Sequence, residues 1–249
     1  MLTNQKIVRV AASADIHCKR TAPLAIEPWL SQAVEQADVL LICGDLTDNG
    51  LPEEAQILAQ ALIGVRIPIV AVLGNHDFHA GKQDEIQQIM SNAGVRVLAG
   101  DSCVVHGVGF AGVKGFAGGF GRRILEPWGE DTLKHFVHAA VEEALKLESA
   151  LAKLGSVPRI AVLHYAPIQE TVAGEPLEIY PFLGCSRLEE PINRYTAVAA
   201  FHGHAHHGAP EGRTLAGVPV YNVSLPLLRR TFPERPPFRL IEVETKGEE

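Results

Sequence analysis

The sequence predicts an α/β protein organised around a buried parallel β-strand. The stretch Val39–Cys43 is entirely apolar and ends at Gly44, which is typical of a strand covered on both faces. Strand-like and helix-like segments alternate along the 249 residues. With 47% apolar residues, a chain of this length can bury one large core. We therefore expect a single α/β domain over residues 1–249.

The first half of the chain alternates between the two kinds of element. Pro at the first position and two glutamates in the first turn predict a helix over Pro52–Leu62. The apolar pattern predicts further strands over residues 7–14 and 67–73, and further helices over 25–36 and 84–93.

The second half contains the longest predicted helix, residues 131–154, whose apolar stripe is expected to pack on a sheet. His106-Gly107 predicts a tight hairpin turn inside 104–113. The tail from Thr245 is expected to fray. The other predicted strands span 95–98, 159–163, 198–201, 218–222 and 238–243.

Charge and cysteine content narrow the class of protein. The net charge of −7 and the pI of about 5.9 disfavour an extended nucleic-acid surface. The four cysteines are widely spaced, so a disulfide framework is not expected. No apolar stretch is long enough to span a bilayer, and no signal-peptide pattern is seen. We expect a soluble cytoplasmic protein without membrane contact.

Five predicted strands are each followed by polar side chains that can bind metal or carry protons. Singly, these residues could be turn caps or solvated side chains. Together they are expected to gather at one sheet edge, where open α/β sheets bind ligands. Carboxylate, amide and imidazole donors without thiolate suit Mn, Fe, Co, Ni or Zn. In chain order the residues are Asp15 and His17; Asp45 and Asp48; Asn75 and His76; His164; and His204 and His206.

The order Asp-x-His, Gly-Asp-x-x-Asp, Gly-Asn-His-Asp, strand-terminal His and Gly-His-x-His resembles that of the calcineurin-like metallophosphoesterase superfamily. The resemblance implies a four-layer α-β-β-α sandwich of two mixed β-sheets flanked by helices, with a dinuclear metal site at the carboxyl ends of the strands. It implies that Asp45 bridges two divalent ions. The first ion would be held by Asp15, His17, Asp45 and His206, and the second by Asp45, Asn75, His164 and His204.

The same resemblance implies roles for two residues outside the ligand set. His76 would be a catalytic imidazole facing the substrate, and the carboxylate of Asp48 would orient its ring. Two metal ions roughly 3.5–4 Å apart would activate a bridging hydroxide and offset the charge that develops during attack on phosphorus. The implied activity is metal-dependent hydrolysis of a phosphoric ester.

Departures from the motifs of related subgroups narrow the substrate. Asn49 and Asp77 stand where the serine/threonine phosphatases of this superfamily have Arg and Glu. The motifs are more similar to those of the cyclic-nucleotide phosphodiesterase-like branch, although Leu163 replaces the glycine often found before the strand-terminal histidine. We expect a small substrate such as a nucleotide phosphodiester. The alternatives are a phosphomonoesterase with the same centre and a non-catalytic metal-binding scaffold.

Two rim loops, at about residues 115–131 and 166–195, are expected to determine specificity. In the first, Arg122 or Arg123 either meets an anionic substrate or lies on a plain surface loop. Other histidines are expected to support ligands or pack nearby (His79, His202, His207) or to lie on an exposed helix face (His135, His138). Candidate wall residues in the second loop are Glu175, Tyr180, Ser186 and Arg187.

Overall fold

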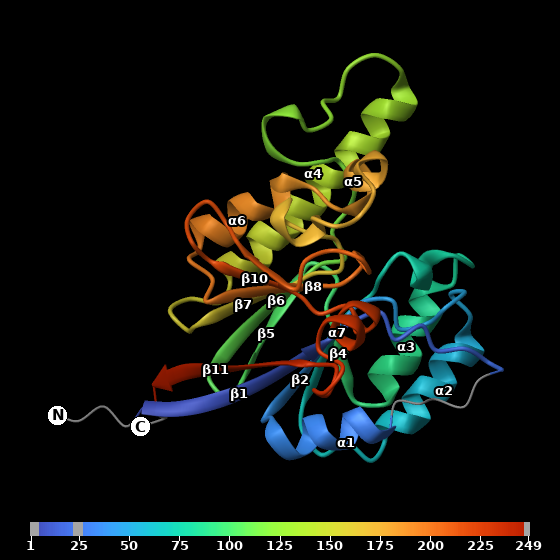
Figure 1. Cartoon of the computed structure of the whole chain (residues 1–249), viewed down its shortest axis with the longest axis vertical. Coiled ribbons are helices and arrows are strands. Elements are labelled where there is room, and N and C mark those ends of the chain that lie inside the picture. Colours follow the sequence, from blue (N-terminus) through green and yellow to red (C-terminus); the bar gives the residue numbers. More distant parts are fainter. Residues whose placement is uncertain (1–4, 22–26, 247–249) are drawn as a thin grey trace.

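A computed structural model, describing residues 5–21 and 27–246, has two mixed β-sheets packed between two layers of helices (Figure 1). The first sheet has the order β11 (Arg239–Lys246), β1 (Gln5–Ser13), β2 (Val39–Cys43), β3 (Ile69–Val72), β4 (Val95–Val97). The second has the order β5 (Asp101–Val105), β6 (Val108–Gly112), β7 (Arg159–Val162), β8 (Ala199–His202), β10 (Pro219–Asn222), β9 (Glu211–Arg213). The predicted four-layer α/β fold is confirmed.

The alternation of side chains along β2 shows why there are four layers. Leu40 and Ile42 face one way, into a core shared with the outer helices, while Leu41 and Cys43 face the second sheet. Both faces of β2 are therefore fully buried, as its continuous apolar sequence predicts.

The helices divide between the two outer faces (Figure 1). On the first sheet, α1 (Glu27–Gln36), α2 (Pro52–Leu62) and α3 (Gln83–Asn92) contribute to one apolar core. On the second sheet, α4 (Asp131–Ala152) and α6 (Glu189–Arg194) contribute to another. The apolar stripe of α4 thus packs on a sheet, as predicted. The other α-helices are the short α5 (Tyr180–Leu183) and α7 (Leu225–Thr231).

The C-terminal end of the described chain departs from prediction at Thr245, while residues 247–249 of the predicted frayed tail lie outside the described residues. Thr245 is not frayed: it lies in β11, is buried, and its hydroxyl donates a hydrogen bond to the carbonyl of Lys6 at 3.1 Å. The antiparallel pairing of β11 with β1 orders this segment through contacts remote in sequence. The predicted start of the first helix, at residues 25–26, lies outside the described residues.

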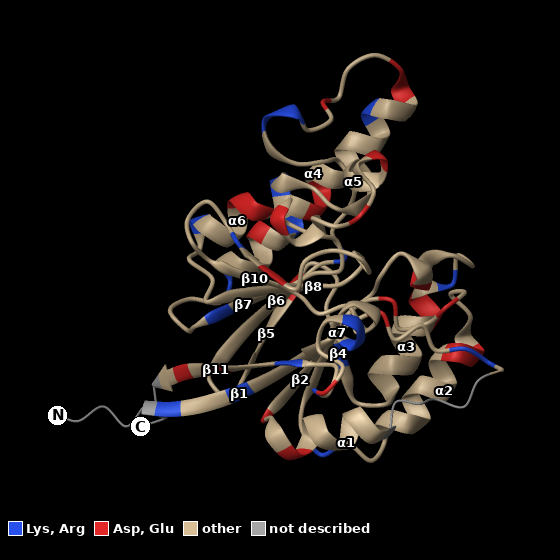
Figure 2. Ribbon diagram, in the orientation of Figure 1, with Lys and Arg blue, Asp and Glu red and all other residues tan. Residues whose placement is uncertain are grey.

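The hairpin at His106-Gly107 is confirmed, because both residues have positive φ, 50° and 80°, between the antiparallel strands β5 and β6. All four cysteines are unpaired and buried. Among the described helices, none combines the length and apolarity needed to cross a membrane. Figure 2 shows acidic and basic residues interspersed along both halves of the ribbon.

Candidate metal centre

The loops after five strands, β1, β2, β3, β7 and β8, meet at one edge of the two-sheet core. The β1 and β2 loops are joined where the Asp15 N–H donates to the carbonyl of Gly44 at 3.0 Å. The sheets are joined where the His204 N–H donates to the Asp15 carboxylate at 3.0 Å. The β3 loop is joined to the β2 and β7 loops, because the His76 N–H donates to Asp45 Oδ1 and Asn75 Oδ1 lies beside His164 Nε2, both at 2.8 Å. All nine predicted site residues therefore lie on loops that contact one another.

Four of the expected ligands have left-handed backbone conformations. The φ angles are 58° at Asp15, 47° at His17, 49° at Asp45 and 69° at His204. This region costs a non-glycine residue energy, and such residues cluster at functional sites. The strained conformations turn these side chains toward a common point as the strands end.

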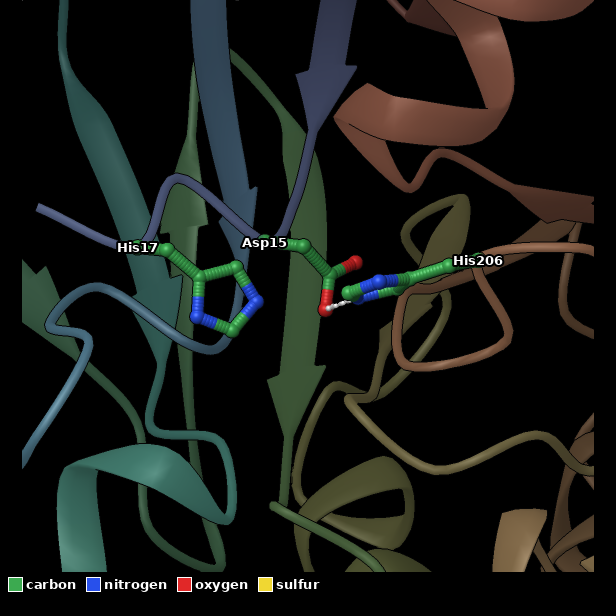
Figure 3. A group of neighbouring side chains, drawn as sticks. All are labelled: Asp15, His17 and His206. Carbon is green, nitrogen blue, oxygen red and sulfur yellow. Dashed lines mark ion pairs between the residues drawn. The ribbon is translucent and has the colours of Figure 1, made fainter.

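Figure 3 shows Asp15, His17 and His206 facing one another. One potential ligand atom from each lies within 4.8 Å of the others. His206 Nε2 is 3.2 Å from Asp15 Oδ1, and this contact raises the pKa of His206. Both ring nitrogens of His17 are buried without a hydrogen-bond partner. Buried polar atoms rarely lack partners, so a cation held by these three residues fits the orphaned imidazole.

Asp45 lies between this group and a second one. Its Oδ2 is 3.7 Å from His17 Nε2, and its Oδ1 is 3.4 Å from His164 Nε2. Burial, with the negative charges of Asp15 and Asp77, raises the pKa of Asp45 to about 9. Such a carboxyl group is costly to ionise without a neighbouring cation. A shared position between two cations would meet that requirement.

His164 presents a lone pair to the second group. Its Nδ1 is 3.0 Å from the carbonyl of Cys43, which can only accept, so Nδ1 carries the proton. Burial lowers the pKa of His164 well below its usual value, so the ring is neutral and Nε2 is an acceptor. This nitrogen faces another acceptor, Asn75 Oδ1, at 2.8 Å. Two facing acceptors fit a cation that both could bind.

His204 completes the second group with Asp45 and His164. Its Nε2 donates to the carbonyl of Phe182 at 3.2 Å, which leaves Nδ1 without its proton. Phe182 belongs to α5 in the second rim loop. One contact therefore fixes the tautomer of an expected ligand and attaches the rim loop to the centre.

The structure corrects the expected contact between Asp48 and His76. The His76 ring does bond to Asp48, but its Nδ1 donates to the backbone carbonyl of Asp48 at 2.6 Å, not to the carboxylate. The carboxylate instead lies 3.4 Å from His17 Nδ1 and 3.6 Å from Lys19 Nζ. The turn after β2 points the Asp48 side chain toward the β1 loop, so the side chain supports His17.

Asp77 has a structural role that sequence reasoning missed, although it lies inside the Gly-Asn-His-Asp motif. Its fully buried carboxylate accepts from the backbone N–H groups of Leu46, Thr47 and Gly74, at 3.2, 2.8 and 2.8 Å, and from the Thr47 hydroxyl at 2.6 Å. One side chain thereby joins the β2 loop to the β3 loop. A turn-rich motif gave no signal for this role.

We expect Asp77→Asn to lower the free energy of unfolding by about 1–3 kcal/mol, because an amide nitrogen would face buried N–H donors. Urea unfolding of metal-free protein measures this loss. Asp84→Asn, at an exposed position of α3, is the control and should unfold like wild type. Equal stability of the two variants would contradict the joining role of Asp77.

Two glycines are also necessary at the centre. A Cβ at Gly74 would overlap Asp45 Oδ1, and one at Gly203 would overlap Asp15 Oδ2, because both separations would be far below van der Waals contact. The glycines that precede Asn75 and His204 in the motifs thus make room for the carboxylates.

The remaining predicted residues lie outside this group of side chains. His202 is buried, and its Nε2 contacts the Thr171 hydroxyl at 2.8 Å, which is a packing role. The rim loops bond to each other, for example where the Gly121 N–H donates to Ser186 Oγ at 3.0 Å. Glu175 accepts from the His207 N–H, Arg187 donates to Leu125, and Tyr180 packs in a small apolar core. Exposed residues are His79, His207, Arg122, Arg123, His135 and His138.

Comparison with known proteins identifies the family of this chain. A model of the family described as calcineurin-like phosphoesterase matches residues 8–208. The chain belongs to the calcineurin-like phosphoesterase family, whose members typically bind two divalent metals. No curated protein matches the sequence significantly.

Solved structures share the fold at low sequence identity. Phosphopantetheinyl hydrolase from Mycobacterium tuberculosis superposes with a TM-score of 0.67 and 18% identity, over 93% of this chain and 95% of that one. The protein TT1561 of Thermus thermophilus has a TM-score of 0.53 and 14% identity, over 90% and 92%. A putative 5'-nucleotidase from Staphylococcus aureus has a TM-score of 0.54 and 15% identity, over 87% of this chain and 48% of that one.

Proposed function

We propose that this chain is a dinuclear metal-dependent phosphodiesterase acting on a small phosphodiester. The proposal places Asp45 between two divalent ions, with Asp15, His17 and His206 on one and Asn75, His164 and His204 on the other. When bound, the ions would acidify a water and offset charge on the phosphoryl oxygens. The orphaned ring of His17 and the facing acceptors of His164 and Asn75 support this arrangement.

His76 is proposed to assist departure of the leaving group. Its Nδ1–H is engaged by the Asp48 carbonyl, so Nε2 is the ring atom available to substrate. The ring lies edge-on to His17, with 4.5 Å between centroids, and so stands beside the proposed ions. A proton on Nε2 can be donated to the leaving alkoxide, and an imidazolium here stabilises the phosphoryl oxygens.

An apolar groove beside the centre is the observation that favours a diester substrate. Phe182 connects this groove to the centre. While its carbonyl contacts His204, its side chain is 58% exposed and lines an apolar groove with Leu125, Leu133 and Phe136. A diester has a second organic substituent, which this groove can receive, whereas a monoester has none. The rim loops 115–131 and 166–195, which both contribute to the groove, are therefore proposed to set specificity.

A matched pair of substrates tests this function. On metal-loaded protein, kcat/KM for bis(p-nitrophenyl) phosphate should exceed that for p-nitrophenyl phosphate by about tenfold or more, a ratio that pocket contacts can supply. Cyclic nucleotides, nucleotide diphosphate esters and oligonucleotides extend the panel. Preference for the monoester would favour the monoesterase alternative, and no turnover of any ester would favour the scaffold.

The same assay tests the metal requirement. A chelator should abolish turnover, and Mn should restore it better than Mg, because four of the seven proposed ligands are imidazoles. Metal content before and after treatment is the control. Turnover by metal-free protein would contradict the mechanism.

A further inference from the structure

Lys114 is a cation fixed beside the metal centre that the proposed mechanism does not use. It lies just after β6, and its carbonyl accepts from the N–H groups of both His164 and Tyr165 at 3.0 Å. The backbone of Lys114 is thereby held against the loop that carries a proposed ligand. Its position relative to the centre is determined by the second sheet.

The Lys114 ammonium lies among three aromatic rings. Nζ is 5.4 Å from the ring centre of Phe78, 4.9 Å from that of Phe116 and 5.0 Å from that of Tyr165. Burial lowers the pKa of Lys114, as expected for a cation that packed side chains separate from water. Aromatic faces stabilise such a cation in part, but they accept no strong hydrogen bonds.

The hydrogen-bonding capacity of this ammonium is mostly unused. Within the described chain, Nζ donates one bond, to the carbonyl of Gly115 at 2.8 Å, and forms no ion pair. The nearby Glu143 is engaged elsewhere, because one oxygen accepts from the Gly115 N–H and the other pairs with Lys146, both at 2.8 Å. Two of the three ammonium donors therefore remain for another acceptor.

The surrounding rings place Nζ at the wall of the centre. Phe78 ends the short 3₁₀-helix that begins at His76. Tyr165 follows His164, and its ring centroid is 4.5 Å from that of His204. The ammonium thus lies between the loop that presents His76 and the loop that presents His164.

We propose that Lys114 binds an anionic oxygen of the phosphoryl group that reacts at the metal centre. This inference rests on the proposed function. A lysine ammonium is a point charge that binds phosphate well, and here it has no direct ion-pair partner among the described residues and two donors unused. It would hold the phosphoryl group from between the loop that presents His76 and the loop that presents His164. Lys114 is then a substrate-binding residue additional to the motif residues.

Isothermal titration of metal-loaded protein with orthophosphate tests this proposal directly. Lys114→Met should raise the Kd for orthophosphate about tenfold or more, the effect of losing a charge-assisted hydrogen bond. Lys114→Gln should do the same, because it also lacks the charge. The control is Lys153→Met at an exposed position after α4, which should bind like wild type. With the diester substrate, both Lys114 variants should raise KM by a similar factor.

Metal content and thermal stability separate phosphate binding from a packing role. Unchanged Kd in both variants, or a rise in Kd matched by loss of bound metal, would overturn the proposal. The titration needs no turnover, so it is independent of the reaction. If wild-type protein bound orthophosphate through Lys114 but hydrolysed no ester, the proposed function would fail, and only the phosphate-binding role of Lys114 would stand.

Discussion

Asp45→Asn is expected to abolish turnover and to lower metal content at both sites. The amide keeps the shape of the side chain but removes the charge that two cations would share, and it leaves one oxygen where two face His17 and His164. We expect a loss in kcat/KM of about a thousandfold or more, because the two proposed ions would supply both the nucleophile and charge stabilisation. Metal analysis after gel filtration, combined with kinetics, measures both effects.

Asp15→Asn and Asp84→Asn complete that experiment. Asp15 contacts His206 and lies in only one of the two groups, so its replacement should chiefly empty one site. Asp84 is exposed on α3, and its replacement should leave both sites filled. Two tightly bound ions and normal turnover in Asp45→Asn would show that the bridging assignment is wrong.

His76→Ala is expected to cut kcat by about a hundredfold or more, the scale seen when one transition-state donor is removed. Metal content should stay near the wild-type value, although His76 also lies within 4.8 Å of His17 and Asp45 as a potential ligand atom. Loss of one ion in this variant would identify His76 as a ligand. A wild-type rate in this variant would show that His76 has no role in catalysis.

Asp48→Asn is the matched comparison for His76. Because the Asp48 carbonyl holds the His76 ring, the side-chain change should leave this contact in place. It should instead weaken metal binding at the His17 site by about tenfold, as loss of a partner of a ligand does. The effects of the two substitutions should therefore multiply in the double variant. If the double variant turned over substrate no more slowly than His76→Ala, the carboxylate of Asp48 would act through the His76 ring, as first expected from the sequence.

The sequence predicted the central strands β2 and β3 because both are short, continuous apolar runs followed closely by glycine. The edge strand β9 and the extension of β11 over Thr245 were not predicted. They depend on pairing with β10 and β1, which leaves no local pattern. The prediction that the second sheet forms a separate layer came from the family resemblance and not from the periodicity of the sequence.

At the site, the motifs predicted which residues lie close together but not where each side chain points. Asp48 and Asp77 lie in neighbouring motifs, yet one carboxylate faces His17 and the other joins two loops. The difference depends on how the turn after β2 packs against the turn after β3. Lys114 has no motif at all, since only the folded chain brings it between Phe78 and Tyr165.

The proposed ligands come from both sheets, and this affects whether metal binding precedes or follows folding of the chain. Asp15 and the His204 N–H that bonds to it are 189 positions apart. While the ribosome has released the chain only as far as β4, the side chains of Asp15 and Asp45 exist without the imidazoles of His164 and His204, and β1 lacks its partner β11. If the proposed ligand sets are correct, each ion has its full set of ligands only after the second sheet has been synthesised and has docked on the first.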